Sequence, residues 1–332
     1  MSIRDLSAAP WWAGLAGLKP LPAPPDAFAV EPRLLRYGRF ARDGAVYRFH
    51  EYHAVELADD SFLNGPLGGP LRDLQAFKRQ VALLLERVSA PVREASLLVP
   101  DAWLRVGFTE SGELPRAAEA RDEVLRWKLK RLVPYRVEEL RVSAVEVEPL
   151  PGQEEPRRLL LGFAIELLLG QLEEAFAANG VEIGFVSNSS LALLAALRPE
   201  PEAKLAGVLL AGDDGYALVF ARAGRPLLHR FKSWNGALPE AARAALVERD
   251  LRLTASFLAE SLPGTTVERL YLSAPPHLEA DWLALIDRGL GAGSVRVAQP
   301  LRPEHLRLAG SEAPAAWREA APLLGAVCQE VR

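Results

Sequence analysis

Short apolar runs with a period of two alternate along this chain with longer segments of helical period, and one such order of elements occurs twice. The first occurrence predicts three strands and a helix, at residues 27–30, 35–40, 45–52 and 71–88. The second predicts the same four elements at residues 205–210, 216–220, 226–231 and 239–262. A repeated order of elements indicates one structural unit used twice.

A short sequence match supports this duplication. Phe-Ala-Arg-Asp-Gly at residues 40–44 recurs as Phe-Ala-Arg-Ala-Gly at residues 220–224, at the same place in each unit. Five similar residues alone are compatible with coincidence in a chain rich in alanine and arginine. The interpretation therefore depends on the shared order of elements as well as on the match.

The segment between the two units has no counterpart in the second half of the chain. It predicts strands and helices at residues 103–108, 116–133, 140–144, 159–165, 166–179 and 181–187. We therefore expect an inserted subdomain at 101–187, between a first subdomain at 26–100 and a second half at 188–332. The second half ends with strand, helix, strand and helix, which is typical of an α/β domain.

Composition excludes several classes of protein. The 332 residues are 49% hydrophobic and 25% charged, which is ordinary for a soluble globular chain, and the net charge of −4 argues against a nucleic-acid partner. The longest apolar stretch, 159–170, is shorter than the roughly 20 residues of a spanning helix and contains Glu166. We expect no transmembrane span. The single Cys328 fits a reducing compartment.

The N-terminal segment at residues 1–25 shows no signal peptide. Trp11 and Trp12 in this segment have two open interpretations. They belong either to a short amphipathic anchor that touches a membrane or a partner, or to a helix folded back onto its own domain.

Familiar catalytic and metal-binding patterns are missing from the sequence. His50 and His53 would point to opposite faces of a predicted strand, so they do not form a metal site. Ser189 and Ser190 stand at a predicted helix start, where an N-cap role explains them better than nucleophilic catalysis does. We expect neither a metal nor an enzymatic activity.

One segment of the predicted insertion resembles a known family. Residues 123–135, Glu-Val-Leu-Arg-Trp-Lys-Leu-Lys-Arg-Leu-Val-Pro-Tyr, followed by Val-Glu-Glu-Leu at 137–140, resemble the signature segment of PilM. PilM is the actin-like cytoplasmic protein of the type IV pilus inner-membrane assembly platform. The resemblance covers about residues 25–330, is strongest across 121–197, and marks a divergent member. The chain is also similar to the cytoplasmic domain of the type II secretion L component.

The resemblance implies an α/β fold, namely the duplicated, ribonuclease H-like fold of actin-like ATPases. In that fold, ATP with Mg²⁺ is held by three turns whose backbone N–H groups approach the phosphates and the adenosine. The first turn of this chain contains Glu31 but no glycine, and Pro32 has no N–H to offer. The first of the three turns is therefore expected to be vestigial.

The other two turns are altered as well. Gly212, Asp213 and Gly215 keep part of the second turn, but the bulky Tyr216 follows them. The third turn has Ser273 and then Ala-Pro-Pro where a Gly-Gly pair is expected. We expect no bound nucleotide. Two alternatives remain: residues 213–215 are an ordinary hairpin turn, or the chain is a working ATP-binding relative that regulates the same assembly.

The remaining function is protein binding. The resemblance implies that the chain binds the cytoplasmic tail of a PilN-like single-span membrane protein beside the inserted subdomain, and contacts a cytoplasmic motor ATPase or platform protein. Arg126, Trp127, Pro134 and Tyr135 match the family motif and are the candidates for this groove, although Trp127 and Tyr135 also fit core positions. We expect a cytoplasmic scaffold, attached peripherally to the inner membrane through its partners.

Overall fold

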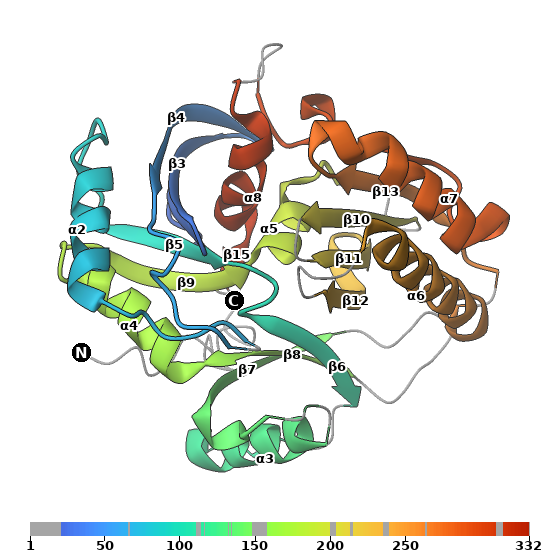
Figure 1. Ribbon diagram of the computed structural model, residues 1–332, viewed down its shortest axis with the longest axis horizontal. Helices are drawn as coiled ribbons and strands as arrows, with labels where there is room; N and C mark the ends of the chain where they lie inside the picture. The colour runs from blue at the N-terminus through green and yellow to red at the C-terminus, as the bar shows by residue number, and fades with distance from the viewer. Residues whose placement is uncertain are drawn as a thin grey trace.

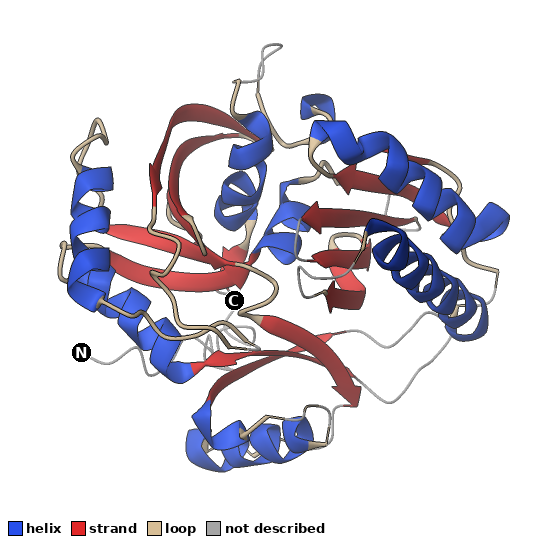
Figure 2. Cartoon of the chain, in the orientation of Figure 1, coloured by secondary structure: helices blue, strands red, loops and turns tan. Residues whose placement is uncertain are grey.

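The computed structural model describes residues 21–331 except 66, 111–113, 116, 132, 134, 148–157, 200–203, 213–214, 235–238, 263 and 310–314. Figures 1 and 2 show two sheet-and-helix halves and a smaller sheet with one helix below them. Residues 1–20, which contain most of the N-terminal segment, lie outside the described residues.

The first half is a five-stranded sheet with the strand order β4-β3-β2-β5-β9. Its elements are β2 (Asp26–Glu31), β3 (Leu34–Asp43), β4 (Val46–Glu56), α2 (Leu74–Leu85), β5 (Glu94–Val99), α4 (Glu166–Ala177) and β9 (Glu182–Asn188). The hairpin strands β2, β3 and β4 pair antiparallel, whereas β5 and β9 add in parallel. Helices α2 and α4 pack on one face of this sheet and cover an apolar core that includes Phe28 and Phe176.

The second half repeats this arrangement with the strand order β12-β11-β10-β13-β14. Its elements are β10 (Leu205–Gly212), β11 (Gly215–Arg222), β12 (Arg225–Ser233), α6 (Glu240–Ser261), β13 (Val267–Ser273), α7 (Glu279–Ser294) and β14 (Ala298–Pro300). The matched pentapeptides lie at corresponding places, where Gly44 and Gly224 have φ angles of 64° and 75° in the β3–β4 and β11–β12 turns. Positive φ favours glycine, so each turn uses one. The two turns still differ, because Gly44 is the first of the two residues between Asp43 and Val46, whereas Gly224 follows Ala223, which itself has a φ of 49°.

The inserted sheet has the strand order β6-β8-β7 and carries one helix. Its elements are β6 (Arg105–Glu110), α3 (Ala118–Lys130), η1 (Val137–Glu139), β7 (Leu140–Val147) and β8 (Arg158–Ile165). Leu125 and Leu129 of α3 are buried against apolar residues of this sheet. The sheet occupies less of the chain than the predicted 101–187, because α4 and β9 return to the first sheet. Parallel pairing of β9 with β5 is a long-range contact that local periodicity does not reveal.

Two helices lie between the halves, α5 (Ser189–Ala196) and α8 (Trp317–Cys328). Although α8 belongs to the predicted second half, it packs on β2, β3 and β5 of the first. The two helices cross at Gly325, where an added Cβ would lie 1.7 Å from the carbonyl oxygen of Ala192. This crossing lies within one apolar core shared by both halves. The short elements η2 (Pro276–Leu278), η3 (Pro303–His305), β1 (Leu21–Pro22) and β15 (Glu330–Val331) complete the described chain.

Candidate functional site

A cavity of about 1110 Å³ lies between the inserted sheet and the first half, and we call it the edge groove. Its walls are one face of α4, the edge strand β9, the edge strand β7, and Asp122 and Arg126 of α3. Neither β7 nor β9 has a second neighbouring strand within the described residues. An edge strand presents unpaired backbone N–H and C=O groups, so two such edges border one groove.

Helix α4 presents two different faces. Leu168, Leu172 and Phe176 are buried in the first half. The groove face recurs at helical spacing and consists of Glu166, Leu169, Gly170, Glu173, Glu174 and Ala177. At Gly170 an added Cβ would have no neighbour within 4 Å, so this part of the wall is bare. A large side chain from a bound segment would find room there.

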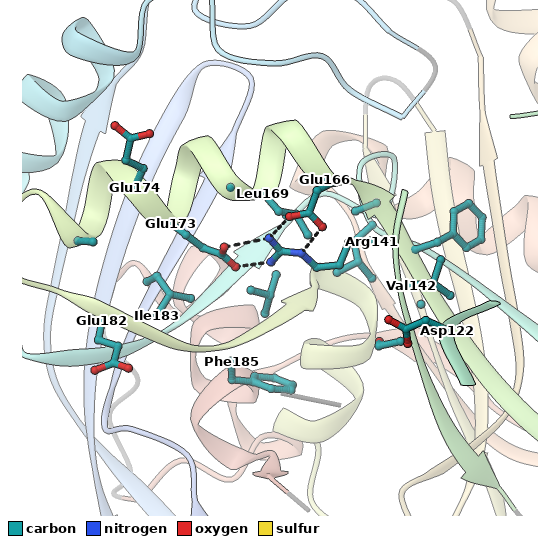
Figure 3. A pocket seen from close by; sticks show the side chains of 18 of the residues that line it. Asp122, Arg141, Val142, Glu166, Leu169, Glu173, Glu174, Glu182, Ile183 and Phe185 are labelled. Carbon is teal, nitrogen blue, oxygen red and sulfur yellow. Dashed lines mark hydrogen bonds and ion pairs between the residues drawn. The ribbon is translucent and has the colours of Figure 1, made fainter. Parts of the chain in front are cut away.

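Arg141 at the start of β7 ties the inserted sheet to α4 across the groove (Figure 3). Its guanidinium donates to Glu166 through Nε at 2.9 Å and through Nη2 at 2.6 Å. It also donates to Glu173 through Nη1 at 2.5 Å and through Nη2 at 3.0 Å. These charge-assisted bonds to Arg141 lower the pKa of the Glu166 carboxyl. The forked contacts join the start of β7 to the groove face of α4.

The four candidate groove residues do not lie together. Arg126 lines the groove, and Tyr135 is half-buried against the small core around Leu129. Trp127 is not a core aromatic, because 59% of it is exposed, and the guanidinium of Arg131 lies 5.6 Å from its ring. Pro134 lies outside the described residues. Sequence reasoning missed Arg141 and Gly170, although the spacing along α4 could have indicated its groove face.

The first expected nucleotide turn is a tight hairpin. Glu31 ends β2, and Pro32 with the next residue forms the turn to β3. The Glu31 carboxylate accepts a hydrogen bond from Nη1 of Arg36 at 2.7 Å. Burial raises the pKa of Glu31, and Arg36 opposes this shift in part. Within the hairpin, Glu31 therefore already has a cationic partner.

The second turn connects two paired strands. Gly212 and Gly215 are opposite each other in the β10–β11 pair, and Asp213 lies outside the described residues. Tyr216 is buried, and its ring packs against Trp282 at a centroid distance of 5.6 Å. Its hydroxyl donates to Asp250 at 3.4 Å. The bulky side chain thus belongs to the core of the second half.

The third turn is held by an ion-pair network. Ser273 ends β13, and Nη1 of Arg318 donates to the carbonyl oxygen of Ala274 at 3.3 Å. Glu279 accepts from Arg318 at 2.7 Å and from Arg302 at 3.1 Å, which lowers the pKa of Glu279. Since Arg318 lies on α8, this network joins the third turn to a helix that packs on the first half. None of the described residues of these three turns lines the edge groove.

A buried Ser–His–Asp cluster lies where the two halves meet. The Ser190 hydroxyl donates to Asp101 at 2.5 Å and lies 3.0 Å from Nε2 of His229. Asp101 also approaches Nε2, at 3.3 Å. In a hydrolase triad the carboxylate contacts Nδ1 instead. The cluster therefore lacks triad geometry and serves to join the end of β5 to α5 and β12.

Two further expectations concern helix ends and metals. Asn188, not Ser189 or Ser190, is the N-cap of α5, and its side chain accepts from the backbone N–H of Leu191. Among the described residues, no group of three or more His, Cys, Asp or Glu side chains is placed to hold a metal ion. Within the same residues, no helix is both long and apolar enough to cross a bilayer.

Comparison with known proteins identifies the fold. No protein-family model and no curated protein sequence matches the chain. The structure is similar to a solved type IV pilus biogenesis complex, PilM–PilN, with a TM-score of 0.68, 16% sequence identity, and coverage of 93% of this chain and 97% of the other. The fold is actin-like. The predicted resemblance to PilM is thus confirmed in the structure, with two duplicated halves and an inserted sheet in the first.

A second solved structure is similar to a lesser degree. It is the cytoplasmic domain of EpsL, an inner-membrane component of the type II secretion system of Vibrio cholerae, with a TM-score of 0.49 and 10% identity. The match covers 92% of this chain and 95% of that domain.

Proposed function

We propose that this protein is a cytoplasmic scaffold of a type IV pilus or related secretion platform, and that its edge groove binds the cytoplasmic tail of a PilN-like membrane protein. The observation that carries the proposal is the pair of free strand edges, β7 and β9, that border one groove. The solved relative is a complex between a similarly folded protein and PilN. Peripheral attachment to the inner membrane and contact with a motor ATPase or platform protein belong to the same proposal.

The groove suits an extended peptide. A strand added to a free sheet edge gains main-chain hydrogen bonds, while its side chains alternate between the two walls. One wall is bare at Gly170, and Leu169 and Ile183 offer apolar contacts nearby. Shape and backbone pairing together therefore favour an extended segment over a helix.

Titration of the tail tests this proposal. A synthetic peptide of the cytoplasmic tail of the PilN-like protein from the same organism is added to the full chain in a calorimeter. We expect saturable binding with one peptide per chain, and no binding of the same residues in scrambled order. Absence of saturable binding up to millimolar peptide would contradict the proposal.

We further propose that the scaffold works without ATP. At each of the three turns, side chains already contact other residues of the chain. These contacts are the Arg36–Glu31 pair, the buried Tyr216 with Asp250, and the Glu279 network. A ligand at 100 times its dissociation constant stabilises a protein by about 2.7 kcal/mol. Thermal unfolding should therefore give the same midpoint with and without millimolar Mg-ATP, whereas a rise of several degrees would favour the ATP-binding alternative. In that event Asp213→Ala should remove the rise.

A further inference from the structure

The signature helix α3 has a second face that the groove does not use. Asp122 and Arg126 line the groove, but Trp127 is 59% exposed on the side of α3 turned to solvent. Figure 1 shows α3 at the outside of the inserted sheet. A single exposed apolar side chain is ordinary on a protein surface, so Trp127 supports an interaction site only together with the charged residues around it.

Basic side chains surround Trp127 at the C-terminal end of α3. Lys130 and Arg131 are exposed, and the Arg131 guanidinium stacks on the Trp127 ring. Lys128 adds a third cation, and its Nζ donates to the carbonyl oxygen of Glu110 at 2.9 Å. The acidic residues Glu119 and Glu123 lie toward the other end of α3. The helix thus carries an aromatic and basic end, which we call the Trp127 patch: Trp127, Lys128, Lys130 and Arg131.

We propose that the Trp127 patch contacts anionic lipid headgroups of the membrane to which the partner tail is attached. Tryptophan favours the boundary between headgroups and acyl chains, and lysine and arginine are attracted to an anionic surface. Charge complementarity therefore favours an anionic bilayer, and not an apolar protein surface, as the partner of the Trp127 patch. The inference rests on the proposed function in one respect: the bound tail of the membrane partner brings α3 near the bilayer.

The contact is weak by itself and gains strength through the tail. Each cation near an anionic surface contributes about fivefold in membrane affinity. Binding of a membrane-anchored tail in the groove makes the lipid contact intramolecular, which raises its effective concentration. Because Asp122 and Trp127 are on different faces of one helix, the patch can meet lipid while the groove is filled. The patch would then set the orientation of the scaffold on the membrane.

Vesicle sedimentation with the full chain tests the proposal. The full chain is mixed at low salt with vesicles of phosphatidylglycerol and phosphatidylcholine, or of phosphatidylcholine alone. We expect binding to the anionic vesicles only, reduced more than tenfold in the double variant Lys130→Glu/Arg131→Glu and reduced several-fold in Trp127→Ala. These exposed positions leave the core unchanged, so the variants should fold. The two charge reversals place acidic groups at the C-terminus of α3 and should lower the unfolding midpoint only slightly.

Two controls make the outcome decisive. The variant Trp11→Ala/Trp12→Ala should bind vesicles like the parent protein; if it alone loses binding, the proposal is overturned in favour of the N-terminal segment. Equal binding by the parent protein and the Trp127 patch variants, or no binding to anionic vesicles, would also overturn it. The patch variants should still bind the soluble tail peptide, so failure here is distinguishable from failure of the proposed function.

Discussion

The substitution Gly170→Trp should abolish most of the affinity of the protein for the partner tail while the fold stays intact. Gly170 faces the edge groove, and a Cβ there meets nothing within 4 Å, so the new side chain extends into the space that the tail needs. We expect the dissociation constant to rise at least tenfold, which corresponds to about 1.4 kcal/mol of binding free energy. Calorimetric titration with the tail peptide measures this change.

Gly107→Trp is the matched control. An added Cβ at Gly107 also has no neighbour within 4 Å, but this residue lies on β6 and does not line the groove. It should bind the tail with the affinity of the parent protein. If Gly170→Trp binds as tightly as Gly107→Trp, the tail does not use the α4 wall.

The substitution Gly325→Ala should have the largest effect on stability. The added Cβ would lie 1.7 Å from the Ala192 carbonyl oxygen and 2.3 Å from its carbonyl carbon, so the backbones of α5 and α8 must move apart. Overpacking of a tight core costs about 1–3 kcal/mol and more when backbone is involved, which exceeds the ~1 kcal/mol that alanine gains over glycine in a helix. We expect a loss of at least about 2 kcal/mol in denaturant unfolding, or failure to fold.

Gly170→Ala is the comparison, and we expect it to change the free energy of unfolding in the opposite direction. It makes the same chemical change inside a helix, but in open space, so only the gain in helix propensity applies. The free energy of unfolding should rise by up to about 1 kcal/mol. If Gly325→Ala is as stable as Gly170→Ala, the backbones of α5 and α8 are not in close contact at Gly325.

The duplicated units could be predicted from the sequence because their signals are local. Alternating strands and the Gly44 and Gly224 turns depend on neighbouring residues, and both units occur where the pattern places them. The ends of the insertion could not be predicted, since β9 pairs with β5 across a long stretch of intervening chain. In the same way, α8 follows the second half in sequence but packs on the first sheet.

The candidate site was predicted only in part, for a related reason. A helical segment such as 123–131 shows which residues share a face, but not which face meets solvent. The pattern therefore leaves a groove and a core position open for Trp127, and its 59% exposure excludes the core. Arg141 pairs with Glu166 and Glu173, and nothing local to β7 indicates that contact. Contacts between the inserted sheet and α4 depend on tertiary structure. The periodicity of a single sequence reports local structure and does not reveal such contacts.

Hydrogen exchange of the full chain, with and without a saturating concentration of the tail peptide, tests the central claim most directly. If the tail adds as a strand in the edge groove, backbone amides at the edges of β7 and β9 become hydrogen-bonded or covered. These amides should then exchange more slowly. Amides of β12 and α6 in the second half should be unchanged. The account is contradicted if the tail binds and the slowed amides lie outside the groove, for example only in the second half.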